Sequence, residues 1–457
     1  MAITDASIYV TDNFAPVSEE VTATELAVRG TIPAELAGRL LRNGPNPLGP
    51  VDLSSHHWFL GDGMVHGIRL RDGKAEWYRN RYVGSSAVSA ALDRDHDKPI
   101  TAAIGPNTNV IGHDGRTLAI VEAGTKPVEL TYELETVGTH NFGNGETNGL
   151  LNGFSAHPKY DPLTGEMHAM CYAWPDAPTL QYVVVDAKGD VTKTVGVSAP
   201  TMPMVHDMGL TQKYAIVMDL PVAVDFDLAM AGSSFPVRWF EDYHARIGLL
   251  NRAATSEADV IWCEIDPCFV FHPLNSYDLP DGRVVMDVCQ FDRMFDKDRN
   301  GPFRDVLPHL VRWTIDPVAG TVHRETVDDR PQEFPRVAGQ VLNQQHRYGY
   351  VAAVTSQDGL AYGPTIKHDL ADKTQDLHHH GPGREAGEPV FVSRAGGDAE
   401  DDGWLLITVY DKSTDRSDVV ILNAQDVGGE EVARIALPAR IPHGFHGNWV
   451  RDTIHSG

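Results

Sequence analysis

Short runs of apolar residues recur along the chain, and Gly, Pro, Asp and Asn separate them as turn signals. Runs of this length and composition are typical of β-strands. We expect strands at Leu118–Glu122, Tyr182–Asp186, Tyr214–Leu220, Arg283–Cys289, Tyr350–Val354, Val390–Ser393, Trp404–Tyr410 and Val419–Leu422. Helical periodicity is scarce, and its best candidate, Val224–Tyr243, is interrupted by Gly232 and Pro236. The pattern therefore predicts an all-β fold.

Two of the expected turns share one formula. Residues 160–166 read YDPLTGE and residues 315–321 read IDPVAGT, with Asp, Pro and Gly at equivalent places. Asp caps such a turn, Pro fixes its first central φ, and Gly accepts a positive φ. Weaker versions occur at 186–189 and 368–372. About seven hairpin-rich units result, which favours a β-propeller, with a large sandwich or jelly roll as the alternative.

Composition narrows the class of protein. The chain has 457 residues, 42% of them hydrophobic, which is long enough for two or three domains or for one closed all-β domain. The formal net charge of −25 argues against a nucleic-acid partner, because phosphate binding needs basic surface. Phosphate-binding loops and the Gly-x-Ser-x-Gly nucleophile motif do not occur.

The cysteines and the apolar runs indicate the cellular compartment of the protein. Cys171, Cys263, Cys268 and Cys289 are too few for a disulfide scaffold, and none forms a Cys-x-x-Cys pair. We expect reduced, buried thiols and a cytoplasmic protein. The polar, acidic start of the sequence predicts no secretory signal, and no apolar run is long enough to span a membrane.

Four histidines stand out among the 21 in the chain. His157, His206 and His272 each precede a turn and a strand-like run, and His446 lies in IPHGFHG, where glycines let backbone approach closely. If each histidine opens the innermost strand of its unit, the four imidazoles converge on one point. Imidazole is a ligand for Zn, Cu, Fe and Ni. Taken singly, each of these histidines is more often structural.

Other histidines and three glutamates complete the list of candidates. We interpret His378-His379-His380 as a solvated loop that binds metal only adventitiously, and His56 and His57 as packing or hydrogen-bonding residues. Ligating imidazoles usually donate their other N–H to an acceptor such as a carboxylate. Glu122, Glu333 and Glu388 each border a strand among apolar neighbours. The alternative is that they are exposed charges at strand ends.

These motifs together resemble the carotenoid cleavage oxygenases, a family that includes a retinoid isomerase and stilbene-cleaving dioxygenases. The similarity runs through RLLRNGPNP, HHWFLGDGMVHGIRL, AHPKYDPLTGEMH, FHPLNSYD, QEFPRV, EPVFVSR, EDDGWLLITVYD and IPHGFHG, and spans nearly the whole chain. The resemblance implies a seven-bladed propeller with one axial Fe(II) beneath a cap of helices and loops. We therefore expect a single domain over residues 1–457, with cap insertions that include residues 224–243.

The resemblance also implies roles for residues. It assigns iron ligation to His157, His206, His272 and His446, and support of those ligands to Glu122, Glu333 and Glu388. The implied reaction is cleavage of a carbon–carbon double bond by O₂ to two carbonyl products, with no acid, base, nucleophile or organic cofactor beyond the iron. Alternatives are an isomerase that uses iron as a Lewis acid, and an inactive propeller that only binds a ligand or partner.

Two departures from the family pattern concern the substrate. Hydroxystilbene-cleaving members carry a lysine directly before the first of these glutamates, where this chain has Val121, and residues 84–86 read GSS where an Arg-Thr pattern is common. Both changes favour a carotenoid or apocarotenoid over a stilbene, although Tyr82 or Ser85 offers a polar group to a phenol. The segment Phe226–Phe240 is a candidate for peripheral membrane contact, with packing on the propeller as the alternative.

Overall fold

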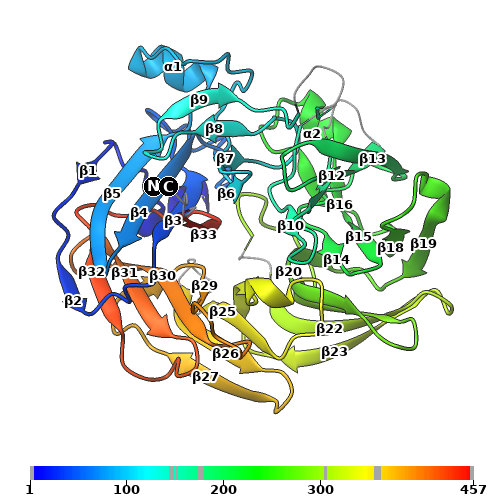
Figure 1. Ribbon diagram of the computed structural model, residues 1–457. Helices are drawn as coiled ribbons and strands as arrows, with labels where there is room; N and C mark the ends of the chain where they lie inside the picture. Colours follow the sequence, from blue (N-terminus) through cyan, green and yellow to red (C-terminus); the bar gives the residue numbers. More distant parts are fainter. Residues whose placement is uncertain are drawn as a thin grey trace.

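The sheets of the protein form a propeller-like ring around a central axis (Figure 1). The computed structural model describes residues 5–143, 149–150, 153–172, 179–302, 306–354 and 362–452. Strands that are adjacent in sequence mostly pair antiparallel, because short turns join them. The predicted all-β class is confirmed, and the arrangement is a propeller rather than a sandwich or a jelly roll.

One sheet closes the ring with strands from both ends of the chain. Its order is β1 (Thr22–Ala23), β5 (Lys74–Tyr82), β4 (Gly63–Arg71), β3 (Gly38–Pro45) and β33 (Gly447–Arg451). The next sheet contains β6 (Asn109–His113), β7 (Arg116–Ile120), β8 (Val128–Leu130) and β9 (Thr136–Thr139). It is followed by β10 (Lys159–Tyr160), β11 (Met167–Cys171), β12 (Thr179–Val185) and β13 (Val191–Ser198). The pairing of β33 with β3 joins the last described strand to the first part of the ring.

An eight-stranded sheet forms the next part of the ring. It runs β14 (Gly209–Leu210), β15 (Tyr214–Asp219), β18 (Arg246–Asn251), β19 (Val260–Glu264), β23 (Thr321–Asp328), β22 (His309–Asp316), β21 (Val284–Phe291) and β20 (Phe269–Asp278). Its two halves are joined by a single parallel partner pair, Glu264 with Thr321. The sheet is therefore two antiparallel meanders that touch at their outer strands.

Two further sheets complete the ring. One contains β24 (Gln332–Arg336), β25 (Tyr348–Val354), β26 (Tyr362–Asp369) and β27 (Thr374–His378). The other runs β2 (Val28–Gly30), β32 (Ala433–Ala436), β31 (Arg416–Asn423), β30 (Gly403–Asp411) and β28 (Arg384–Ala386), and β29 (Val390–Ser393) also pairs with β30. All eight strands predicted from the sequence correspond to strands of these sheets, with ends that differ by a few residues.

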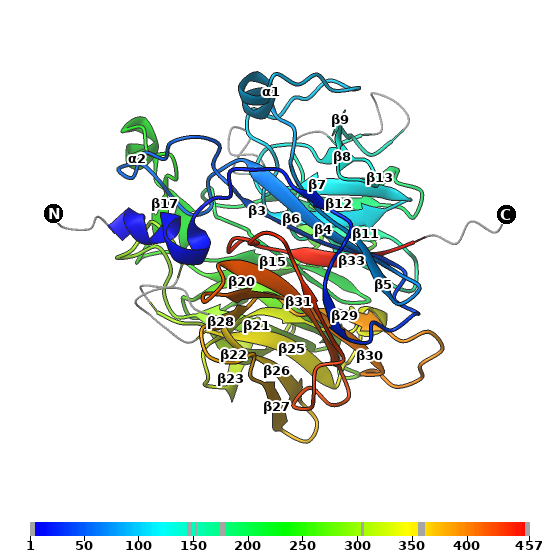
Figure 2. The same cartoon turned by 90° about the vertical axis from the view of Figure 1, so that its left-hand side faces the viewer.

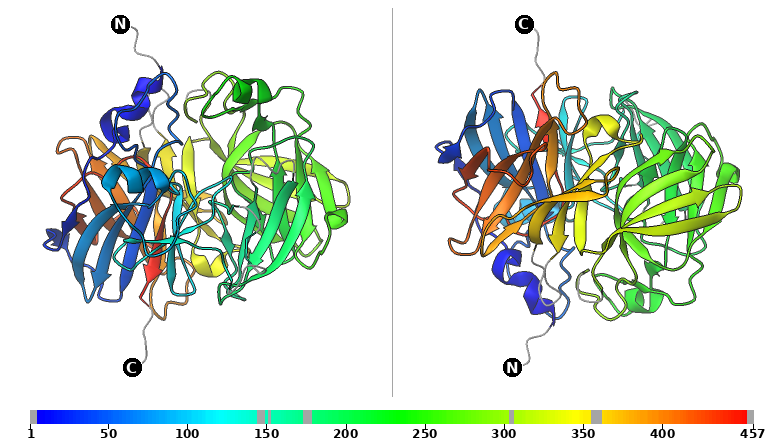
Figure 3. Two further views of the ribbon diagram at one scale, coloured as in Figure 1. Left: turned by 90° about the horizontal axis from the view of Figure 1, so that it is seen from above. Right: turned by 90° about the horizontal axis from the view of Figure 1, so that it is seen from below.

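Helices are short and few in the described part of the chain. They are α1 (Ser86–Leu92), α2 (Phe226–Met230) and the 3₁₀ helices η1 (Asp5–Val10), η2 (Asp12–Phe14), η4 (Glu257–Asp259) and η5 (Gly339–Val341). A two-stranded sheet, β16 (Val222–Val224) with β17 (Val237–Trp239), lies beside α2. The N-terminal helices and α2 project from the same face of the ring (Figures 2 and 3).

The predicted helix over Val224–Tyr243 is wrong for most of its length. Only Phe226–Met230 is α-helical, and its first turn is capped by the Asp225 side chain. The chain then turns back at Gly232, and Val237 pairs with Val224 in the β16–β17 hairpin. The two residues expected to interrupt a helix, Gly232 and Pro236, thus lie in the turn that replaces it.

The two hairpin turns with the shared formula form as predicted. Gly165 and Gly320 have φ of 73° and 70°, and each donates its N–H to the carbonyl of the Asp four residues earlier. These turns connect β10 to β11 and β22 to β23. The local sequence therefore fixes the hairpins that build the sheets.

Candidate metal centre

Four histidines from three sheets meet near the axis of the ring. His157 lies just before β10, His206 before β14, His272 within β20, and His446 directly before β33. Each adjoins or lies within the edge strand of its sheet, as predicted, although His272 is inside its strand rather than at its start. All four are buried, and one ligand atom from each lies within 4.8 Å of the others. We call this group the four-histidine cluster.

Local backbone features bring the rings of the cluster together. The strand that carries His272 shifts register next to Pro273, which has no N–H to donate to the ladder. The segment before His446 packs against β3, where a Cβ on Gly444 would come within 2.9 Å of the Gly44 Cα. The glycines of IPHGFHG therefore permit backbone to approach backbone, and this contact places the His446 imidazole at the axis.

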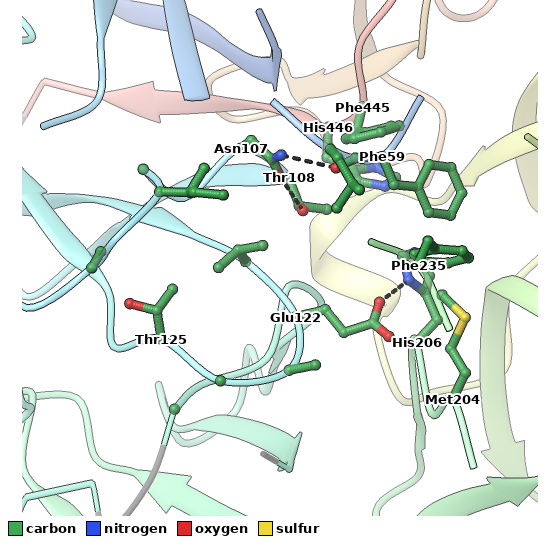
Figure 4. A pocket seen from close by; sticks show the side chains of 18 of the residues that line it. Phe59, Asn107, Thr108, Glu122, Thr125, Met204, His206, Phe235, Phe445 and His446 are labelled. Carbon is green, nitrogen blue, oxygen red and sulfur yellow. Dashed lines mark hydrogen bonds and ion pairs between the residues drawn. The ribbon is translucent and has the colours of Figure 1, made fainter. Parts of the chain in front are cut away.

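Three of the cluster histidines hydrogen-bond to buried carboxylates through Nδ1. His206 pairs with Glu122 (Figure 4), His272 with Glu333 at 2.6 Å, and His446 with Glu388 at 2.9 Å. Glu333 is 1% exposed and Glu388 5% exposed, and the side chain of Glu122 is 12% exposed. The alternative that these glutamates are solvent-exposed strand-end charges is therefore wrong.

His157 has a different environment. Its Nδ1 lies 3.8 Å from Asp207 Oδ2, which is beyond hydrogen-bond distance, and the Lys159 Nζ donates to the same oxygen at 2.7 Å. The backbone N–H of His157 donates to Ser155 Oγ at 3.0 Å. Within the described residues, His157 is thus oriented by its backbone and by packing rather than by a carboxylate.

Burial keeps the imidazoles of His157, His272 and His446 neutral. It lowers the pKa of His446 to about 3 and holds the pKa of His157 and of His272 well below 6.5. Burial raises the pKa of Glu333 to about 8, and a cation bound beside it would favour its carboxylate form. Burial alone would also raise the pKa of Glu388, but the Arg336 guanidinium and His446 bring it below the usual range.

The hydrogen bonds also decide which ring nitrogens carry lone pairs. A carboxylate only accepts, so the Nδ1 atoms of His206 and His446 carry hydrogen and their Nε2 atoms do not. His206 Nε2 lies 2.9 Å from His157 Nε2 and 3.2 Å from His272 Nε2. Ring nitrogens of three histidines thus converge at a spacing at which one ion can bind them all. The residues present therefore match the needs of a metal ion with imidazole ligands.

An apolar cavity of about 1050 Å³ reaches the cluster at His206, His272 and His446. Aromatic side chains form much of its wall, and several of them, with Met204, surround the approach to His206 in Figure 4. The aromatic residues that line it are Trp58, Phe59, Phe235, Phe271, Phe334, Tyr362 and Phe445. We call it the aromatic cavity. Its size and lining suit a large, flat, apolar ligand.

The sequence did not single out the aromatic residues individually, although five of them lie in the motifs HHWFL, FHPL, QEFPRV and IPHGFHG. Val121 lines the aromatic cavity, as expected of a residue that contacts substrate. The sequence reasoning also missed Lys126, whose Nζ donates to Asn141 Oδ1 at 2.6 Å in the cavity wall. No local pattern in the sequence marks Lys126 and Asn141 as neighbours of a cavity.

Residues 84–86, where the chain departs from the Arg-Thr pattern, do not contact the aromatic cavity directly. Ser85 is buried and caps α1 by accepting the N–H of Val88, and Gly84 packs against Thr136 and Ile100. Neither these residues nor Tyr82, whose hydroxyl pairs with Asn46, is among the described residues that line the aromatic cavity. Their backbone hydrogen bonds reach the cavity wall through the neighbouring segment 101–105, which lines it.

A second cavity, of about 1080 Å³, reaches the cluster from the side of His157. It also touches His272 and His446, but its wall is rich in charged residues, including Arg39, Arg69 and Lys159. The four-histidine cluster thus lies between an aromatic cavity and a polar one. An apolar ligand is expected to occupy the aromatic cavity, because burial in the polar cavity would strip water from charged groups.

Two predictions concern histidines outside the cluster, and one of them is wrong. His57 is buried, accepts the Phe59 N–H and stacks on Phe235, as a packing residue should. The interpretation of residues 378–380 as a solvated loop is wrong, because His378 is 7% exposed and His380 5% exposed. Only His379 of the three is exposed to solvent.

The segment Phe226–Phe240 combines exposed and buried apolar residues. Phe226 is 65% exposed and Met230 87% exposed, whereas Phe235 and Trp239 are buried. Phe235 lines the aromatic cavity, and so does Ile104, which is 54% exposed. Within the described residues, no helix is both long enough and apolar enough to cross a membrane.

The amino-acid sequence is similar to known proteins over nearly its whole length. The family model for "Retinal pigment epithelial membrane protein" matches residues 14–451. The chain is 40% identical to "Carotenoid cleavage oxygenase" of Mycobacterium tuberculosis, over 97% of this chain and 98% of that protein. It is 30% identical to "Apocarotenoid-15,15'-oxygenase" of Synechocystis sp., over 93% of this chain and 92% of that protein.

Solved structures give the same result for the fold. The lignostilbene dioxygenase of Pseudomonas brassicacearum superposes with a TM-score of 0.87 at 26% identity, over 97% of this chain and 98% of that chain. Cobalt-substituted Synechocystis ACO superposes with a TM-score of 0.83 at 27% identity, over 98% and 99%. The ring of sheets described above is therefore shared with both of these proteins.

Proposed function

This chain belongs to the retinal pigment epithelial membrane protein family, the carotenoid cleavage oxygenases, and we propose that it is an Fe(II)-dependent dioxygenase that cleaves a carbon–carbon double bond of a carotenoid or apocarotenoid. The products are two carbonyl compounds, and both oxygen atoms derive from O₂. The observation that carries the proposal is the convergence of four buried histidines at the wall of an apolar, aromatic cavity.

The proposed iron ligands are His157, His206, His272 and His446. When bound, iron would supply the redox chemistry that activates O₂, which amino-acid side chains do not supply. An imidazole that binds a metal ion is neutral, so four such ligands would leave the charge of the ion uncompensated. The support for a metal at this position is the convergence of four buried imidazole nitrogens, together with the cobalt form of the Synechocystis relative.

The carboxylates and the cavity wall have separate tasks. Glu122, Glu333 and Glu388 hold the rings of three ligands in orientation and fix the Nδ1–H tautomer. The aromatic wall excludes water and holds a flat conjugated substrate beside the cluster. Specificity for the scissile bond is then a matter of how far the substrate enters the aromatic cavity.

A stilbene is the second candidate substrate, and one observation favours it. Lys126 lies in the wall of the aromatic cavity, where its ammonium group offers a donor to a phenol oxygen. The similarity to a lignostilbene dioxygenase supports the same reading. Against it, Val121 offers only apolar contact, so a phenol next to that position would lose about 1–3 kcal/mol if left unpaired.

The proposal includes the number of blades and a cap over the cavity. If the eight-stranded sheet is divided at its single Glu264–Thr321 pair, the sheets count as seven blades. The N-terminal helices, α2 and the β16–β17 hairpin then form a cap over the mouth of the aromatic cavity, as part of a single domain. Support comes from Trp58 and Phe235, which line the cavity beneath these elements.

We also propose where the enzyme lies in the cell and how it contacts a membrane. We expect peripheral membrane contact through Phe226 and Met230, the exposed ends of α2, which lies on the same face of the ring as the N-terminal helices. A cytoplasmic location is supported by the four cysteines, which are all unpaired and buried, as in a reducing compartment.

The test is aerobic incubation of the iron-loaded protein with carotenoids, apocarotenoids and hydroxystilbenes, followed by mass spectrometry of the products. We expect paired aldehyde or ketone products from a carotenoid or apocarotenoid, each with one ¹⁸O atom when ¹⁸O₂ is supplied and solvent exchange is controlled. Turnover of stilbenes alone would assign the second candidate. No product from any alkene, with iron bound, would contradict the proposed activity.

A further inference from the structure

A second group of metal-ligating side chains lies at the outer edge of the ring, where two sheets meet. His378 is the last residue of β27, His380 follows two residues later, and Glu431 lies just before β32 of the neighbouring sheet. One ligand atom from each of the three lies within 4.8 Å of the others. The two histidines are buried, and Glu431 is partly buried. We call this group the edge cluster.

Each histidine of the edge cluster has one satisfied ring nitrogen and one without a partner. His378 Nδ1 lies 3.1 Å from the Val427 carbonyl oxygen, which can only accept, so Nδ1 carries the hydrogen and Nε2 the lone pair. His380 Nε2 lies 3.0 Å from Thr365 Oγ1. Among the described residues, His378 Nε2 and His380 Nδ1 are buried and have no hydrogen-bond partner.

Buried polar atoms without a partner are rare in folded proteins, and each costs about 1–3 kcal/mol. Here two such atoms occur on adjacent rings, whose centroids are 4.8 Å apart, and His378 Nε2 lies 3.8 Å from Glu431 Oε1. A ligand that accepts lone pairs from two imidazoles and a carboxylate would satisfy all three groups.

The charges around the edge cluster favour a cation. Arg434 donates to both carboxylate oxygens of Glu431 and, at 2.6 Å, to Asp418 Oδ2, so one guanidinium lies between two carboxylates. The three groups together carry a net charge of −1. Glu431 therefore keeps some negative potential for a cation on its other side, although Arg434 will weaken binding compared with a free carboxylate.

We propose that His378, His380 and Glu431 bind one divalent transition-metal ion, with zinc as the preferred ion, in a structural site between the two sheets. Two imidazoles and one carboxylate are a common zinc donor set, and a water molecule would complete four ligands. The mixed nitrogen and oxygen donors disfavour calcium and magnesium, which prefer oxygen ligands alone. The ion would tie β27 to the segment before β32, and it has no part in the reaction proposed above.

The chain offers a matched control in the exposed His379, which lies between the two proposed ligands. The wild type and the variants His378→Ala, His380→Ala and His379→Ala are loaded with Fe(II) without oxygen and dialysed against Zn²⁺. Zinc and iron are then both counted per chain, so that zinc which displaces iron is recognised. We expect one zinc beyond the iron in the wild type and in His379→Ala, and loss of that zinc in the other two variants.

Thermal unfolding gives an independent measurement. Added Zn²⁺ should raise the Tm of the iron-loaded wild type and of His379→Ala, but not of His378→Ala or His380→Ala, because an ion that binds only the folded state stabilises it. Equal zinc in all four proteins, or loss of zinc in His379→Ala, would overturn the proposal. If the alanine variants fail to fold, X-ray absorption of zinc-bound wild type decides: two imidazoles support the site, and a shell without imidazole refutes it.

Discussion

Replacement of Glu388 by glutamine should weaken metal binding more than the same change at the other two carboxylates. One Glu388 oxygen accepts from His446 Nδ1 and from Arg336 Nε, each at 2.9 Å, and the other accepts the Gly447 N–H at 2.8 Å. A glutamine has one oxygen and one NH₂ group at these positions. Whichever way it lies, its N–H hydrogens face another N–H donor, so at least one buried donor loses its acceptor.

The other two carboxylates tolerate an amide better. Glu333 accepts from His272 and from the Phe334 N–H through one oxygen, and its other oxygen has no partner among the described residues, so an NH₂ can take that place. Glu122 accepts from the Tyr172 hydroxyl, which can rotate and accept from an amide instead. In the metal-bound protein all three substitutions remove one negative charge, so the ranking there reflects the hydrogen-bond geometry.

The expected magnitude follows from the lost hydrogen bond. A buried donor without an acceptor costs about 1–3 kcal/mol, which corresponds to roughly 10- to 100-fold in metal affinity. We expect Glu388→Gln to fall in this range, and Glu333→Gln and Glu122→Gln to lose less than about tenfold. The measurement is the Fe(II) dissociation constant, determined without oxygen by competition with a chromogenic chelator.

A matched control lies close by. Glu385 pairs with His443 Nε2 at 2.7 Å, but His443 does not belong to the four-histidine cluster. Glu385→Gln should therefore leave the Fe(II) dissociation constant unchanged. The reasoning fails if Glu388→Gln binds iron as tightly as Glu333→Gln does, or if Glu385→Gln weakens binding as much as Glu388→Gln.

Three further predictions concern the metal, the substrate and the surface. His272→Ala should lose bound iron and activity while far-ultraviolet circular dichroism stays unchanged; full iron content in this variant would remove His272 from the site. Val121→Lys should raise kcat/KM for a 4-hydroxystilbene relative to an apocarotenoid by about tenfold, because a phenol gains a partner; an unchanged ratio would show that this position does not contact the substrate. Phe226→Ser with Met230→Ser should reduce sedimentation with lipid vesicles but leave turnover of a detergent-dispersed substrate unchanged, and wild-type sedimentation of the double variant would refute membrane contact there.

The sequence alone determined the class of fold and the four histidines of the cluster. Strands and their tight turns depend on neighbours in sequence, so YDPLTG and IDPVAG predicted hairpins that the structure contains. The four histidines were found because they recur at similar places in repeated units. The helix over 224–243 failed for the opposite reason, since the pairing of β16 with β17 outweighed local propensity.

Only the tertiary structure decided which residues meet across the ring. The pairing of β33 with β3 brings Gly444 onto Gly44, and contacts between sheets assign Glu122, Glu333 and Glu388 each to one histidine. Such contacts join residues many tens of positions apart, and no local pattern specifies them. For the same reason the sequence missed Lys126 in the cavity wall. Burial of His378 and His380 likewise arises from the packing of one sheet against the next, which a run of three histidines does not reveal.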